Sequence, residues 1–145
     1  MIRPCLRTFL LLCGLCLLPA AEAWAQLAVV VNAKSGVSVL TRNDVMNIFL
    51  GRFRQFPTGL DARPVDVVDS HPDRARFYRL LVSKEVPEIN AYWARLVFTG
   101  RVTPPQQVNS AEEVIKWVQA NPGGIGFVDV SKVDGRVRVV LELMQ

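Results

Sequence analysis

The hydrophobic residues of this chain follow two periods, one typical of strands and one typical of helices. Apolar runs of strand length occupy residues 27–32, 64–69 and 124–129. The first run, LAVVVN, is rich in valine and predicts a strand that is covered on both faces of a sheet. Residues 136–143 instead alternate polar and apolar side chains, as a half-exposed strand at a sheet edge does. The pattern therefore predicts four strands.

Four other segments carry apolar residues at spacings of three and four, which predicts amphipathic helices. The sequence also marks their ends. Ser110 and Glu113 form a capping box at the start of the last helix, and the run Asn121-Pro122-Gly123-Gly124 stops it. The helices are predicted between Thr41 and Gly51, from Pro72 to about Ser83, from Pro87 to Phe98, and between Ser110 and Asn121.

The segments between these elements carry turn residues. Phe53 and Phe56 lie in an irregular loop, and we expect both rings to pack onto the core. Two prolines keep residues 102–105 extended, and Asp134-Gly135 predicts a hairpin turn before the last strand. The order of the elements predicts an α/β fold in which helices flank a mixed sheet.

The N-terminal residues predict a secretory signal peptide. Arg3 and Arg7 precede an apolar run, and Ala23-Trp24-Ala25 offers small residues at both positions that a signal peptidase requires. We expect cleavage after Ala25, which leaves residues 26–145 as one domain located in the periplasm.

A membrane anchor is the alternative to a cleaved leader. The apolar run has about ten residues, whereas a spanning helix needs roughly 20. Neither Cys13 nor Cys16 follows the small residue that lipidation requires. We therefore expect no stable membrane insertion.

Composition narrows the function of the remaining chain. Cleavage removes all three cysteines, so neither a disulfide nor a thiolate metal site is expected. It also removes Arg3, Arg7 and Glu22, which lowers the formal net charge from +4 to +3. The remaining arginines are spread among acidic neighbours and form no basic stripe with interleaved aromatics, which argues against nucleic-acid binding. Such a charge is compatible with a protein that favours small anions.

The start of the second predicted helix carries the candidate binding residues. Asp69, Ser70 and His71 follow a predicted strand, and open α/β sheets place ligands at the carboxyl ends of strands, where helix N-termini favour anions. Arg74 lies one turn into the helix on the same face as Phe77, so its side chain should point toward protein or ligand. Two interpretations are open: a capped helix with a stacking arginine, or a contact to a bound anion.

Catalysis and metal binding find little support. His71 is the only histidine, and no nucleophile motif accompanies it, so a capping or solvent-facing role is expected. The neighbouring aspartates show no calcium-loop spacing, and no His or Cys cluster is present. We expect no enzyme activity, no cofactor and no metal ion.

Four motifs together resemble a known family. They are NDVMNIFLGR at 43–52, WARLVFTG at 93–100, the double proline at 104–105 and NPGGIGFVD at 121–129. In combination they are similar to the phosphate-binding proteins of ABC importers, and the chain resembles one lobe of these two-lobed proteins. The resemblance implies a single periplasmic-binding-protein-like lobe, export, and non-covalent recognition of phosphate or another oxyanion.

The resemblance leaves two functions open. The family binds phosphate with a Ser-Gly-Thr type string at the helix start, where this chain has residues 69–74, so only Ser70 and the helix amides remain as donors. One function is recognition of a small inorganic anion by Ser70, Arg74, Asp69 and His71, with an ABC permease or an envelope protein as partner. The alternative is an accessory interaction protein of the envelope with a decayed ligand site and no transport role. Whether two chains pair to form a cleft also stays open.

Overall fold

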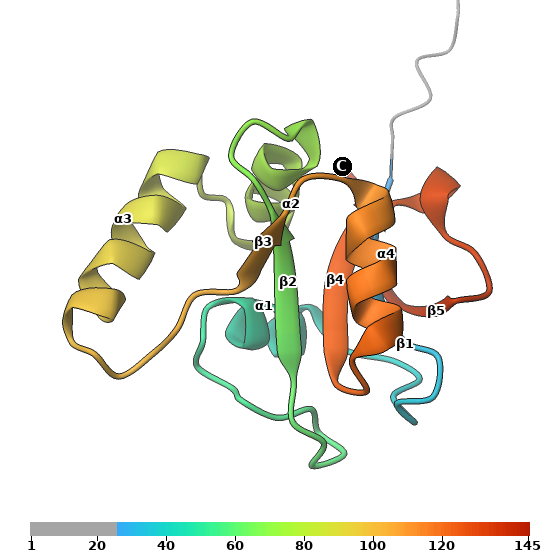
Figure 1. Ribbon diagram of the computed structural model, residues 1–145. Helices are drawn as coiled ribbons and strands as arrows, with labels where there is room; N and C mark the ends of the chain where they lie inside the picture. The colour runs from blue at the N-terminus through green and yellow to red at the C-terminus, as the bar shows by residue number, and fades with distance from the viewer. Residues whose placement is uncertain (1–25) are drawn as a thin grey trace, which may run out of the picture.

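A five-stranded mixed sheet forms the centre of the computed structural model, which describes residues 26–145 (Figure 1). The predicted signal peptide lies outside these residues. The strand order is β3-β2-β4-β1-β5. The strands are β1 (Leu27–Asn32), β2 (Arg63–Val67), β3 (Gln106–Val108), β4 (Gly124–Asp129) and β5 (Val137–Leu143). Because β1 is antiparallel to β4 and β5 while β2 is parallel to β3 and β4, the predicted mixed α/β sheet is confirmed.

Helices cover both faces of this sheet (Figure 1). The helices are α1 (Arg42–Phe49), α2 (Pro72–Val82), α3 (Val86–Phe98) and α4 (Ala111–Ala120), with a short 3-10 turn, η1, at Val130–Lys132. Helix α4 covers one face, α1 and α2 cover the other, and α3 packs on α2 away from the sheet. All four helices begin and end within a few residues of their predicted positions.

An aromatic cluster joins α1 and α2 to the sheet. Phe77 of α2 stacks on Phe127 of β4 with ring centroids 3.8 Å apart. Phe49 of α1 contacts both rings, with centroid distances of 4.8 Å to Phe77 and 5.9 Å to Phe127. All three rings are buried, and such pairs add about 0.5–1.5 kcal/mol each beyond the burial of their area. The cluster therefore fixes α2 on the sheet, and with it the predicted site at the start of α2.

Three details of the sequence prediction are wrong. Residues 106–108, where no strand was predicted, form the edge strand β3; the polar sequence QQV gives no strand signal, and the pairing comes from β2 beside it. Strands β4 and β5 do not form a hairpin, because β1 lies between them. Phe56 is buried as expected, but Phe53 is 47% exposed.

Glycines in β4 allow α4 to approach the sheet closely. A Cβ atom on Gly124 would lie 2.8 Å from the Cα of Val118 and 2.9 Å from its carbonyl oxygen. A Cβ atom on Gly126 would lie 2.6 Å from Val114 Cγ1 and 2.8 Å from Val65 Cγ1. The space that the missing side chain of Gly126 leaves is therefore filled by packed valines.

We expect Gly124→Ala to lower the free energy of unfolding by about 1–3 kcal/mol, because the added methyl group meets the backbone of α4. Gly135→Ala is the matched control, since a Cβ there meets nothing within 4 Å, and its effect should stay within about 0.5 kcal/mol. Urea unfolding followed by circular dichroism measures both variants. Equal midpoints for the two would contradict this account of the packing between α4 and β4.

Candidate functional site

Two helix N-termini lie at the same edge of the sheet. Strands β2 and β3 are adjacent and parallel, and each leads into a helix, α2 or α4, at its carboxyl end (Figure 1). The Val68 N–H donates to the Val108 carbonyl at 3.0 Å, which ties the two strand ends together. The predicted site residues 69–74, here called the α2 tip, lie at this edge.

Arg74 lies inside the protein, with an exposed fraction of 2%. Its Nε donates to Asp66 Oδ2 at 3.1 Å. Its Nη1 donates to Asp69 Oδ1 at 2.9 Å and to Asn90 Oδ1 at 3.0 Å. The guanidinium carbon also lies 5.3 Å from the centroid of the Tyr78 ring. Of the two interpretations of Arg74, the geometry corresponds to the stacking arginine, whose charge two carboxylates already balance.

Asp66 is the centre of this cluster and is 1% exposed. Besides Arg74, its carboxylate accepts hydrogen bonds from the Tyr78 hydroxyl and the Val67 N–H, both at 2.7 Å. Burial raises the pKa of the Asp66 carboxyl above its usual value, against the opposing effects of Arg74 and these donors. Burial also raises the pKa of Tyr78 well above its usual value, and the charge of Asp66 adds to this rise. Tyr78 is therefore held as a protonated hydrogen-bond donor.

The first turn of α2 has few groups left to donate to a ligand. His71 is the N-cap, and its Nδ1 accepts from the Asp73 N–H at 3.2 Å. The His71 carbonyl accepts from the Arg74 N–H at 3.1 Å, and Pro72 has no N–H. Ser70 is exposed and makes no hydrogen bond to any other described residue. Ser70, with its hydroxyl and N–H, and His71, with its Nε2–H, are therefore the predicted site residues of the α2 tip that keep unused donors.

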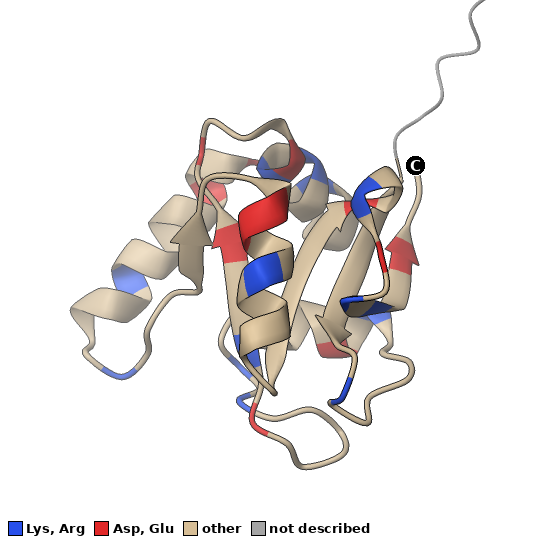
Figure 2. Ribbon diagram, turned by 45° about the vertical axis from the view of Figure 1, so that its right-hand side comes forward, with Lys and Arg blue, Asp and Glu red and all other residues tan. Residues whose placement is uncertain are grey.

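The charge at the α2 tip does not favour an anion. The Asp69 side chain is 57% exposed and accepts from Asn90 Nδ2 at 2.8 Å. Asp73 pairs with Arg76 at 3.1 Å. Acidic positions also gather where α2 and α4 begin (Figure 2). Because each nearby arginine already has a carboxylate partner, an incoming anion would meet the field of exposed carboxylates.

Three residues of the cluster were missed from the sequence. Asp66 lies inside the apolar run 64–69, and a carboxylate at a buried strand position needs a partner, so it could have pointed to Arg74 eight residues later. Tyr78 lies one turn after Arg74 on the same helix. Asn90 gives no local signal, because its approach depends on how α3 packs on α2.

Metal and membrane features were also sought in residues 26–145. No three His, Asp or Glu side chains of this range are grouped as metal ligands would be. None of its helices combines the length and the apolar character that crossing a membrane requires.

We expect Asp66→Asn to destabilise the protein by about 3 kcal/mol at neutral pH, because it leaves a buried guanidinium without its main counter-charge. Asp69→Asn is the matched control: it removes the exposed partner of the same arginine and should cost about 1 kcal/mol or less. Chemical unfolding measures both. Similar losses for the two variants would contradict the central place of Asp66.

The raised pKa of Tyr78 predicts how stability changes in alkali. The unfolded chain releases the tyrosine proton near pH 10 while the native state keeps it, so stability falls as pH rises above about 10. Tyr78→Phe lacks this proton, and its stability should fall less between about pH 10 and 11. Urea unfolding at several pH values measures the two slopes, and equal slopes would contradict the prediction.

Solved structures of phosphate transport proteins share this fold. An ABC-type phosphate transport receptor from Vibrio cholerae aligns with a TM-score of 0.64 and 23% identity, over 81% of this chain and 47% of the receptor. A protein from Clostridium perfringens with bound phosphate, assigned to the phosphate ABC transporter substrate-binding proteins, aligns with a TM-score of 0.65 and 19% identity, over 80% of this chain and 45% of that chain. PstS from Borrelia burgdorferi aligns with a TM-score of 0.61 and 14% identity, over 80% and 47%.

The comparisons define the fold and its extent. No protein-family model and no curated protein matches the sequence. The chain spans about half the length of the three solved proteins, consistent with a single lobe. The chain therefore has an α/β fold that matches about half of a phosphate transporter substrate-binding protein.

Proposed function

We propose that this chain is an exported binding-protein-like lobe that contacts another protein of the cell envelope, and that its α2 tip no longer captures an oxyanion. The observation that carries this proposal is the state of Arg74. The arginine nearest the expected ligand position is buried, and its charge is held by Asp66 and Asp69. The partner would be an envelope protein, such as the permease of an ABC importer.

The interaction free energies favour this function over anion capture at the α2 tip. Turning Arg74 toward a ligand would leave Asp66 buried without its partner, and breaking such a pair costs about 3–5 kcal/mol. Ser70 can offer its hydroxyl and its N–H and His71 its Nε2–H, each worth about 1.5–3 kcal/mol toward a charged ligand. Lost translational and rotational freedom takes back about 4 kcal/mol or more of that sum on binding. A millimolar dissociation constant requires about 4 kcal/mol. The tip therefore lacks the interactions for phosphate binding even at millimolar concentration.

The second candidate function is recognition of phosphate or another oxyanion at Ser70 and His71. Two observations favour it. Ser70 is exposed with unused donors, and one protein of the same fold, from Clostridium perfringens, is solved with bound phosphate. In this function the ligand would touch the α2 tip from outside, and Asp69 would oppose it.

Isothermal titration calorimetry separates the two functions. Phosphate or sulfate, added to the purified chain up to about 10 mM, should give no saturable heat. Ser70→Ala should behave like the unchanged protein. Saturable heat that disappears in Ser70→Ala would contradict the proposal and establish the second candidate. Heat that persists in Ser70→Ala would place the anion away from Ser70, which refutes the second candidate and is compatible with an α2 tip that captures no oxyanion.

A further inference from the structure

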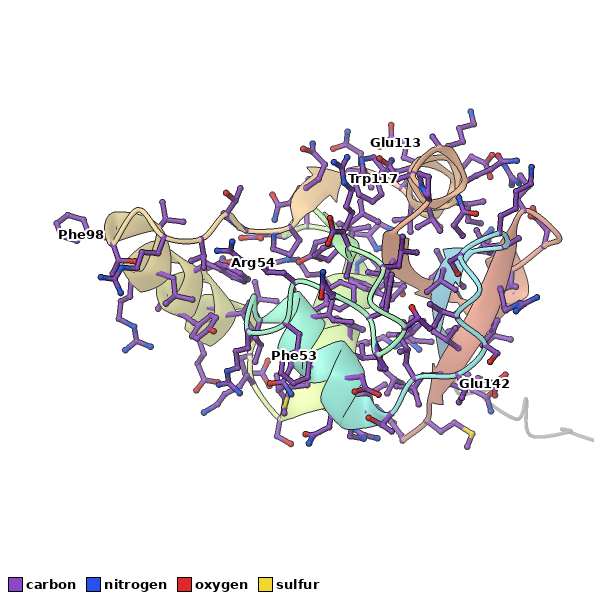
Figure 3. All side chains as sticks on the ribbon, turned by 90° about the horizontal axis from the view of Figure 1, so that it is seen from below. Phe53, Arg54, Phe98, Glu113, Trp117 and Glu142 are labelled. Carbon is purple, nitrogen blue, oxygen red and sulfur yellow. The ribbon has the colours of Figure 1, made fainter. Side chains whose placement is uncertain are left out.

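Two loops lie at the edge of the sheet opposite the α2 tip (Figure 1). They carry arginine and aromatic residues. The loop from α1 to β2 carries Arg52, Phe53 and Arg54, and the connection from α3 to β3 carries Arg101. Arg54 Nη2 donates to the Arg101 carbonyl at 3.1 Å, which joins the two loops. Figure 3 shows Phe53 and Arg54 from this side. We call Arg52, Phe53, Arg54 and Arg101 the arginine surface.

The positive charge of this surface is not balanced within the described part of the chain. Its three arginines are exposed, and none lies within 4.0 Å of a carboxylate oxygen. Asp61 is the acidic residue of the same loop, and its Oδ1 accepts a hydrogen bond from Gln55 at 3.2 Å. The two arginines in the first turns of α2, Arg74 and Arg76, in contrast, both have carboxylate partners. The two ends of the sheet therefore differ in how their charges are satisfied.

A cavity of about 350 Å³ opens beside Arg54 and Arg101. Ile48, Trp93 and Val102 line it together with polar residues, and polar atoms make up the larger part of its exposed wall. Trp93 is 6% exposed, and its Nε1 has no hydrogen-bond acceptor among residues 26–145. The cavity has room for a large side chain, with arginines at its rim to hold neighbouring acidic groups.

The loop that carries three of these residues is anchored to the fold. Phe56 is buried, and its N–H donates to the Leu60 carbonyl at 2.9 Å. The Ala62 N–H donates to the Arg54 carbonyl at 2.9 Å. The Tyr92 hydroxyl of α3 donates to the Leu50 carbonyl at 2.7 Å. Because the backbone is already held, binding here would lose less conformational entropy than binding to a free loop.

We propose that the arginine surface docks an acidic segment of a partner protein, which places a large side chain in the cavity and carboxylates on Arg52, Arg54 and Arg101. This inference rests on the proposed function and names its surface. Arginine and aromatic residues dominate the binding energy of protein interfaces, and guanidinium groups match carboxylates in charge and geometry. Phe53 at 47% exposure would be covered by the same partner.

Other occupants fit the surface less well. Nucleic acid needs a longer basic stripe, whereas these arginines occupy one corner of the molecule. Free phosphate gains little from exposed arginines, because water screens them. A partner protein excludes that water over a larger area and so strengthens each contact.

A labelled peptide tests the surface directly. Fluorescence polarisation follows the binding of a short peptide that alternates Glu-Glu pairs with leucine. Arg101→Glu, which leaves the backbone carbonyl that Arg54 contacts, should weaken binding about tenfold or more. Arg138→Glu is the matched control, because Arg138 is also exposed without a carboxylate partner but lies on β5, and it should change binding by less than about twofold. Equal losses in both variants, or no binding at all, would overturn the arginine surface.

Site-specific photo-crosslinking in the host envelope separates the surface from the proposed function. A photoreactive residue is placed at Phe53 or at Phe98, which is 94% exposed at the far end of α3 (Figure 3). We expect a crosslink from Phe53 that Arg101→Glu removes, that Arg138→Glu keeps and that the peptide competes away. A crosslink from Phe98 alone would overturn the arginine surface and leave the proposed function standing. No crosslink from either position would refute both.

Discussion

The buried ion pair between Asp66 and Arg74 is the interaction on which the rest of the structure depends. A carboxylate in an interior strand is costly unless a cation and hydrogen-bond donors surround it. Arg74 and Tyr78 supply these from α2, and Asn90 extends the network to α3. The network thus positions two helices relative to β2, and the aromatic cluster around Phe77 completes the same contact from the apolar side.

The same pair also decides what the α2 tip can do. In a sheet of this topology the carboxyl ends of the strands and the helix N-termini beside them are the usual place for a ligand. Here the arginine that would attract an anion is used inside the protein, and the first amides of α2 are taken by its own cap. At the opposite edge the exposed charge is positive, because the arginine surface has no carboxylate partner within residues 26–145. A fold shared with phosphate transport proteins can therefore carry a different function, because function depends on the site and not on the fold.

Much of this architecture could be predicted from the sequence, because local signals agree with the final structure. Pro72 begins α2, and the valine-rich run 27–32 lies inside the sheet. Ser110 caps α4 by accepting from the Glu113 N–H, but the predicted capping box is not closed, because the Glu113 carboxylate accepts from the Asn109 N–H instead. Strand β3 could not be predicted, since its three polar residues become a strand only through β2. The contacts of the candidate site were harder to predict than the strands and helices. His71 as a capping residue follows from its place before a proline, but the burial of Arg74 depends on Asp66 and on Asn90 from another helix.

The protonated side chain of Arg74 offers the most direct test of the central claim. Nuclear magnetic resonance can record the Nε–H signal of Arg74 and its exchange with water, with and without phosphate. A guanidinium held by Asp66 should give a slowly exchanging signal that phosphate does not shift, and Asp66→Asn should accelerate the exchange. A signal that exchanges rapidly in the unchanged protein, or that moves as phosphate is added, would show that Arg74 is available to ligands and would contradict the account.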